Sequence, residues 1–171
     1  MSKLSNLACF LFVLFAVGQA QGAQLDLMKY TTPNDITSED IWERNLVLKA
    51  GVTNLTAEIY MDKIYNQKVG DKPWYICIAA HGVRTAYWQS TYVMKSLFFL
   101  QRDYADEANY AYIETTNELL RETFENNGIP QCIFVKDAKP YYAPWHRLNV
   151  GEIREFMANH SELKVDALRW L

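Results

Sequence analysis

The chain has 171 residues, of which 50% are hydrophobic and 22% charged, and its formal net charge is −3. This composition is sufficient for a packed core and argues against intrinsic disorder. A weak negative charge without a basic run argues against a nucleic-acid-binding protein. The length suits one domain of ordinary size.

The N-terminus has the pattern of a secretory signal peptide. Lys3 is followed by an apolar run at 7–17, and the small residues Gly18 and Ala20 fit a cleavage site after Ala20. The run is shorter than the about 20 apolar residues of a membrane-spanning helix. We therefore expect residues 1–20 to be removed, which takes the net charge from −3 to about −4 as Lys3 is lost. An uncleaved signal anchor is the alternative.

The rest of the chain divides into three parts. Residues 21–48 are interpreted as an N-terminal arm, in which Ser38 is expected to cap a short helix. Residues 49–160 are predicted to form the domain, and residues 161–171 a C-terminal tail. The signal-like segment predicts the endoplasmic reticulum lumen or the cell exterior as the location. The tail has no KDEL-type retrieval signal, so the protein would be secreted or retained through a partner.

Strands and helices alternate along the predicted domain. Residues 74–80 are continuously apolar, as in a strand that is buried on both faces. The other predicted strands are 52–56, 108–113, 131–136 and 141–144, and the predicted helices are 57–67, 85–104, 116–125 and 150–159. A turn is expected at 137–140. This order predicts an α/β fold of three layers, with a central mixed sheet flanked by helices.

Three stretches carry a resemblance to a known family. They read VTNLTAEIYMDKIYNQ at 52–67, KPWYICIAAHGVRTAYW at 72–88 and GIPQCIFVKDAK at 128–139. In this order and spacing they resemble the thioredoxin superfamily, in particular its protein disulfide isomerase-like branch. The resemblance implies a thioredoxin-like fold over most of the mature chain.

The redox residues of that family are missing. The resemblance places the two catalytic cysteines at Val83 and Ala86, or in a register shifted by one residue at Gly82 and Thr85. The family chemistry needs a thiolate at a helix N-terminus and a second thiol to resolve the mixed disulfide. The family's buried carboxylate would fall at Cys77 or Ile76. The degenerate turn at 82–86, with Arg84 as its charged residue, is therefore predicted to contain no catalytic residue.

The remaining cysteines are too few for a disulfide scaffold and too far apart for a zinc site. Cys9 lies in the expected signal peptide, and Cys77 and Cys132 lie in predicted strands. We expect Cys77 and Cys132 to be buried free thiols. A disulfide between them and a functional thiol remain open as alternatives. His81, His146 and His160 are scattered, and no metal or cofactor is expected.

A proline at the start of the fourth strand matches the family pattern. The resemblance implies that the Ile129–Pro130 peptide bond is cis and that it faces the active-site turn. An extended peptide could pair there through its main chain without any thiol. The alternative is that Pro130 only preserves the fold. Aromatic residues expected around this region, either in the core or along a groove, are Trp74, Tyr75, Tyr87, Trp88, Tyr141, Tyr142 and Trp145.

Two N-glycosylation sequons agree with a secretory location. They are Asn54-Leu55-Thr56 and Asn159-His160-Ser161. Asn159 precedes the tail, where a glycan can be accommodated. Asn54 falls in a predicted strand, which makes it the less favoured of the two.

The function predicted from these features is a redox-inactive thioredoxin-like protein of the secretory pathway. It would bind a polypeptide or a partner protein near Pro130, without nucleic acid and without a membrane span after signal cleavage. The first alternative is a divergent thiol–disulfide oxidoreductase or isomerase that uses Cys77 or Cys132. The second is a structural accessory subunit that docks through the arm and tail. The oligomeric state is not predicted.

Overall fold

Five strands form one mixed sheet in this computed structural model, which describes residues 26–81, 88–124, 128–144 and 149–159. The strand order is β1-β3-β2-β4-β5. The strands are β1 (Thr53–Asn54), β2 (Trp74–Ala79), β3 (Asn109–Glu114), β4 (Gln131–Lys136) and β5 (Lys139–Tyr142). β1, β3 and β2 are parallel, whereas β4 is antiparallel to both β2 and β5. The predicted mixed sheet is confirmed.

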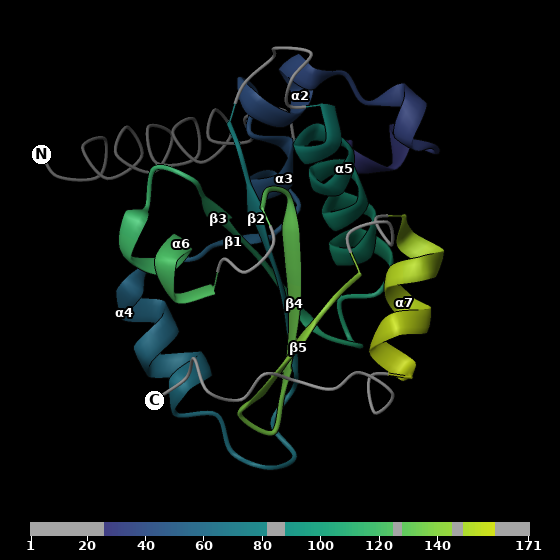
Figure 1. Ribbon diagram of the computed structural model, residues 1–171. Coiled ribbons are helices and arrows are strands. Elements are labelled where there is room, and N and C mark those ends of the chain that lie inside the picture. The colour runs from purple at the N-terminus through teal and green to yellow at the C-terminus, as the bar shows by residue number, and fades with distance from the viewer. Residues whose placement is uncertain (1–25, 82–87, 125–127, 145–148, 160–171) are drawn as a thin grey trace, which may run out of the picture.

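Helices cover both faces of the sheet (Figure 1). One face carries α4 (Ala57–Ile59), the π-helical segment η3 (Tyr60–Tyr65) that continues it, and α6 (Glu118–Phe124). The other face carries α5 (Trp88–Asp103) and α7 (Val150–Ala158). This is the α/β, thioredoxin-like class expected from the sequence, with the predicted order of elements.

The central strand β2 explains why the core has two halves. Its side chains alternate, so that Ile76 and Ile78 point towards α4 and α6 while Tyr75 and Cys77 point towards α5 and α7. All six residues of β2 are buried. Each large apolar side chain buried in this way contributes about 1.5–3 kcal/mol, which makes β2 the main anchor of both layers.

The segment before the sheet packs against α5. It contains η1 (Leu27–Lys29), η2 (Pro33–Asp35), α2 (Ser38–Trp42) and α3 (Leu46–Lys49). Trp42 is 4% exposed and its indole Nε1–H donates to Thr91 Oγ1 of α5 at 3.0 Å. The Arg102 guanidinium of α5 donates to the carbonyl oxygens of Leu27 and Tyr30. The described part of the predicted arm therefore shares one hydrophobic core with the domain.

The N-cap of α2 is Thr37, and the expectation that Ser38 caps this helix is wrong. Thr37 Oγ1 accepts a hydrogen bond from the backbone N–H of Asp40 at 3.1 Å, and the Asp40 carboxylate accepts one from the backbone N–H of Thr37 at 2.9 Å. This reciprocal capping box satisfies two orphan donors of the helix at once. It starts the helix one residue earlier than a Ser38 cap would allow.

The last hairpin is tighter than predicted. Asp137 and Ala138 alone form the turn, with φ of 52° and 59°, and β5 begins at Lys139. Positive φ at both central residues is typical of a two-residue type I′ turn, whose twist matches that of the flanking strands. Pro140 is tolerated because β5 is an edge strand of the sheet.

Candidate functional site

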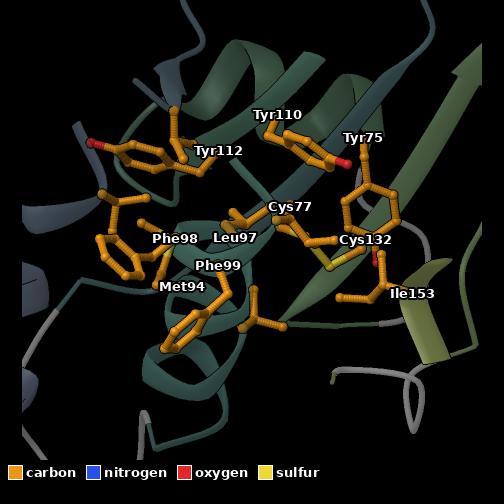
Figure 2. Close-up of a cluster of buried hydrophobic side chains, with 14 of the residues drawn as sticks. Tyr75, Cys77, Met94, Leu97, Phe98, Phe99, Tyr110, Tyr112, Cys132 and Ile153 are labelled. Atoms are coloured by element: carbon orange, nitrogen blue, oxygen red, sulfur yellow. A yellow bond between two sulfur atoms is a disulfide. The ribbon is translucent and has the colours of Figure 1, made fainter. Parts of the chain in front are cut away.

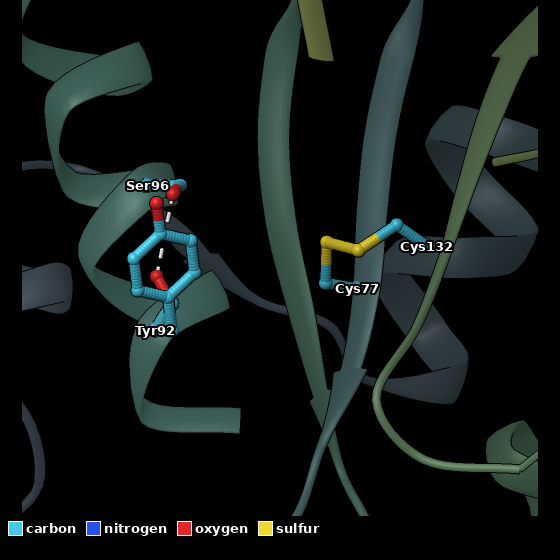
Figure 3. The surroundings of a disulfide bond; sticks show 4 residues. All are labelled: Cys77, Tyr92, Ser96 and Cys132. Atoms are coloured by element: carbon cyan, nitrogen blue, oxygen red, sulfur yellow. Dashed lines mark hydrogen bonds between the residues drawn. A yellow bond between two sulfur atoms is a disulfide. The ribbon is translucent and has the colours of Figure 1, made fainter. Parts of the chain in front are cut away.

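Cys77 and Cys132 form a disulfide, so the expectation of two free thiols is wrong. The two residues are direct partners in the antiparallel register of β2 and β4, with Cα atoms 4.1 Å apart and sulfur atoms 2.17 Å apart. Figure 3 shows the bond crossing from one strand to the other. Direct partners on one face of an antiparallel pair bring their Cβ atoms close together. The register of β2 against β4 therefore determines that Cys77 pairs with Cys132, and this register cannot be read from the sequence.

The disulfide lies inside the larger half of the core. Cys77 is 0% exposed and Cys132 is 2% exposed. Figure 2 shows the bond among Tyr75, Tyr110 and Ile153, within the cluster that joins the sheet to α5 and α7. Thiol–disulfide exchange requires a thiolate to approach a sulfur atom directly. In the folded protein, both sulfur atoms are shielded from an attacking thiolate. We therefore regard the bond as a structural clamp, which joins the neighbouring strands β2 and β4.

The Ile129–Pro130 peptide bond is cis, as the resemblance implies. It lies immediately before β4, whose first residue, Gln131, is opposite Ile78 of β2. Ile129 packs against the core cluster beneath α4 and α6, while Pro130 is half-buried. The proline thus sits at the end of the sheet where β2 finishes.

Aromatic residues gather where β2 ends and α5 begins. His81 is exposed, and its ring meets the buried ring of Trp42 edge-to-face at 4.9 Å. The Ala80 backbone N–H donates to Ser90 Oγ at 3.1 Å, which ties the strand end to α5. In the first turns of α5, Trp88 is 63% exposed and Tyr92 is 37% exposed. This end of the molecule therefore combines a buried aromatic support with two solvent-facing aromatic rings.

The structure divides the aromatic residues singled out from the sequence. Trp74 and Tyr75 belong to the core, with 9% and 0% exposure, and Trp74 also lines an open hollow at the start of β2. Tyr141 and Tyr142 are half-buried on β5. Tyr87 and Trp145 lie outside the described residues, as do Gly82, Val83, Arg84, Thr85 and Ala86 of the degenerate turn.

Sequence reasoning missed the contribution of the arm to this region. The Trp42 ring packs against His81, and its indole N–H is hydrogen-bonded to Thr91 of α5. Trp42 lies far before His81 and Thr91 in the sequence. Nothing in the local pattern around Trp42 indicates that contact. The apolar spacing of Ile41, Trp42, Leu46 and Val47, all buried, was the available signal that the arm packs on something.

The tyrosines of the core are not poised for acid–base chemistry. Burial raises the pKa of Tyr75 and Tyr110, and burial together with the nearby Glu114 raises the pKa of Tyr112 to about 12. All three are therefore neutral phenols near pH 7. The Tyr75 hydroxyl is buried without a hydrogen-bond partner among the described residues.

Other kinds of site find little support in the described part of the chain. No three His, Cys, Asp or Glu side chains there come together as metal ligands would. Across those same residues, no helix has both the length and the apolar character needed to cross a membrane. Two open hollows, of about 310 and 560 Å³, lie beside Pro73 and Trp74 where β2 starts, at the opposite end of that strand from Pro130.

Comparison with known proteins identifies no family for the chain. No family model matches the sequence, and no curated protein matches it. Among solved structures, a thioredoxin of Malassezia sympodialis (Mala s 13) is similar, with 12% sequence identity and a TM-score of 0.45. The match covers 65% of this chain and 91% of that one. The thioredoxin-like architecture is seen in the chain itself, in the strand order β1-β3-β2-β4-β5 with a cis-proline before β4.

Proposed function

We propose that this chain is a redox-inactive thioredoxin-like protein of the secretory pathway that binds a polypeptide or a partner protein around Pro130. The observation that carries the proposal is the state of Cys77 and Cys132. Both are consumed in a disulfide inside the sheet, with 0% and 2% exposure. The segment before α5, where the related enzymes hold their reactive thiols, contains no cysteine between residues 81 and 88.

The absence of reactive thiols there has a direct chemical consequence. Dithiol exchange needs an accessible thiolate whose pKa is lowered at a helix N-terminus, and a second thiol within reach. Valine, glycine, alanine and threonine at the matching positions can neither attack a disulfide nor resolve one. We therefore propose a binding role, rather than a redox role, for the region around Pro130.

The support for polypeptide binding is the backbone and side chains around Pro130. The described ladder between β2 and β4 begins at Gln131, so the residues before it lie beyond the paired part of the sheet. An extended chain that pairs with such backbone gains main-chain hydrogen bonds, and neighbouring pockets or rings provide side-chain selectivity. Trp88 and Tyr92, both solvent-facing on α5, are the rings proposed for that role.

The secretory location is supported by the same disulfide. Disulfides persist in the endoplasmic reticulum and outside the cell, whereas cytosolic thiols are kept reduced. This agrees with the signal-like segment at 1–20, and the proposed location is the endoplasmic reticulum lumen or the exterior.

A reductase assay tests the proposal. The secreted protein is incubated with insulin and dithiothreitol, and precipitation of the insulin B chain is followed beside an active thioredoxin. We expect the insulin B chain to precipitate at the same rate as in a control with dithiothreitol alone. Turnover that disappears in Cys132→Ala would instead establish the divergent oxidoreductase.

A binding assay tests the positive part. Unfolded polypeptides labelled with a fluorophore are titrated with the wild-type protein, with Trp88→Ala and with the control Leu119→Ala. Leu119 is 66% exposed on α6, across the sheet from α5. We expect weaker binding only for Trp88→Ala. Equal affinities for all three proteins would exclude the proposed surface.

A further inference from the structure

The sequon Asn54-Leu55-Thr56 begins in an edge strand of the sheet. β1 is the first strand of the order β1-β3-β2-β4-β5, and Asn54 is its last residue. The side chain of Asn54 is exposed. From the sequence, Asn54 was the less favoured sequon because it falls in a predicted strand. In the structure this strand is an edge strand, and Asn54 faces solvent.

The three residues of the sequon have separate tasks in the fold. Leu55 is 1% exposed in the core, and its backbone N–H donates to the carbonyl oxygen of Tyr112 at 2.8 Å. Thr56 is exposed and caps α4, with its Oγ1 accepting from the Ile59 backbone N–H at 3.3 Å. The Asn54 amide makes no hydrogen bond to any described residue, whereas Asn66 and Asn109 use theirs to bond backbone carbonyls. Leu55 and Thr56 therefore hold the segment while the Asn54 side chain is left to solvent.

We propose that Asn54 is N-glycosylated and that its glycan covers the β1 edge of the sheet. This inference rests on the secretory location proposed above. In the transfer, Asn54 Nδ2 bonds to C1 of an oligosaccharide carried on a lipid pyrophosphate. The bond from C1 to the pyrophosphate oxygen breaks, that oxygen keeps the electron pair, and Nδ2 loses one proton.

The folded structure is compatible with this modification. The glycan is bulky and solubilising and needs a surface position. Asn54 provides one, and neither the Leu55 anchor nor the Thr56 cap has to move to accommodate a substituent on Nδ2. A charged or glycosylated edge also resists unwanted strand addition, which is a hazard of exposed sheet edges.

The location of Asn54 separates the glycan from the proposed binding region. Asn54, Tyr112, Cys77 and Cys132 form one row across the sheet, on four successive strands. Three strand spacings amount to about 14 Å between the first and last members of this row. Pro130 is two residues from Cys132, so the attachment point of the glycan lies three strands away from the strand that Pro130 precedes.

Asn159 is a weaker basis for the same inference. It is exposed and forms the C-cap of α7, with its backbone N–H donating to Glu155 O at 3.0 Å. The other two residues of its sequon, His160 and Ser161, lie outside the described residues. Asn159 therefore enters the test as a comparison.

Peptide mapping of the full chain secreted by eukaryotic cells tests the proposal. Digestion with peptide N-glycosidase in ¹⁸O-labelled water converts a glycosylated Asn into labelled Asp, which mass spectrometry locates. We expect the label at residue 54 in the wild type and in Asn159→Gln, and its loss in Asn54→Gln and Thr56→Val. Thr56→Ser is the matched control, because serine keeps both the sequon and the helix cap.

A separate measurement tests whether the glycan covers the β1 edge. After enzymatic removal of the glycan, we expect the wild type to self-associate more than the intact protein in sedimentation velocity, at equal concentration. Unchanged sedimentation would overturn this part of the proposal.

The failure of each idea can be distinguished. An unlabelled residue 54 in protein that has lost its signal and is protected from added protease in microsomes overturns the glycan but not the location. Protein that is accessible to the protease overturns the location and the glycan together. Insulin reduction concerns only the proposed redox inactivity and leaves the glycan unaffected.

Discussion

Cys77 of β2 and Cys132 of β4 face each other across an antiparallel strand pair, and their bond joins the two strands in the interior of the protein. This bond closes a loop across a sequence separation of 55 residues. It thereby limits the freedom of the unfolded chain, which is how most of the stabilisation by a disulfide is explained.

The first prediction concerns that clamp. We expect the double variant Cys77→Ala with Cys132→Ala to lower the free energy of unfolding by about 4 kcal/mol, from the loop-closure entropy. Urea unfolding followed by circular dichroism measures this change. The native protein should also resist dithiothreitol until urea opens the core, because both sulfurs are buried. Rapid reduction of the folded protein would contradict the assignment as a structural clamp.

The second prediction concerns the hairpin between β4 and β5. Ala138 has φ of 59°, a left-handed conformation that costs an L-residue about 1–2 kcal/mol. Ala138→Gly removes most of this cost and keeps the backbone N–H that donates to Gln67 Oε1 at 3.0 Å. We therefore expect a gain of about 1 kcal/mol, after allowing for the greater freedom of glycine in the unfolded chain.

Gly70 provides the matched control for the hairpin. It has φ of 89°, and a Cβ added there would meet nothing within 4 Å, so Gly70→Ala changes the backbone preference alone. We expect a loss of about 1 kcal/mol in thermal or urea unfolding. Changes of the same sign in Ala138→Gly and Gly70→Ala would refute the explanation from backbone conformation.

The third prediction is an acid-sensitive contribution from Asp40. Burial raises the pKa of this carboxyl, but hydrogen bonds from Thr37 and Tyr30 and the charge of Arg44 outweigh burial, and the net pKa is lowered. Because the folded-state pKa lies below the unfolded value of about 3.9, the ionised group stabilises the fold above that pH. The contribution is lost as the pH falls through the folded-state pKa.

Asp40→Asn tests this dependence. We expect a loss of about 2 kcal/mol at pH 7, because a hydrogen-bonded and 5% exposed carboxylate is replaced. The difference between wild type and variant should shrink below about pH 4. Asp35, an exposed carboxyl whose pKa is also lowered, accounts for part of the remaining acid sensitivity. A difference that stays constant from pH 7 to acid would contradict the role of ionisation.

The fourth prediction separates two tryptophans at the same end of the molecule. Trp42 is 4% exposed and hydrogen-bonded to Thr91, so Trp42→Ala should cost about 3–5 kcal/mol of stability. Trp88 is 63% exposed, so Trp88→Ala should change stability by less than about 0.5 kcal/mol. Urea unfolding of both variants measures the difference. A large loss of stability in Trp88→Ala would assign that ring to packing and remove it from the proposed binding surface.

Strong local signals explain what could be predicted from sequence. The all-apolar stretch at 74–80 is typical of a strand buried on both faces, and the cis bond before Pro130 followed from the family resemblance. Local patterns were less reliable at boundaries. The helix cap is Thr37 rather than the predicted Ser38, and the last turn consists of Asp137 and Ala138 rather than residues 137–140. Both differences arise because caps and turns depend on hydrogen bonds and backbone angles rather than on residue type alone.

The sequence by itself determined the kind of fold, through periodicity and the order of elements, and the missing thiols of the turn, because a side chain that is not encoded cannot act. Only the tertiary structure decided the pairing of Cys77 with Cys132, the support of His81 by Trp42 and the edge position of Asn54. Each of these is a relation between residues that lie far apart in the chain. Such relations arise from strand register and packing across layers, which no local pattern contains.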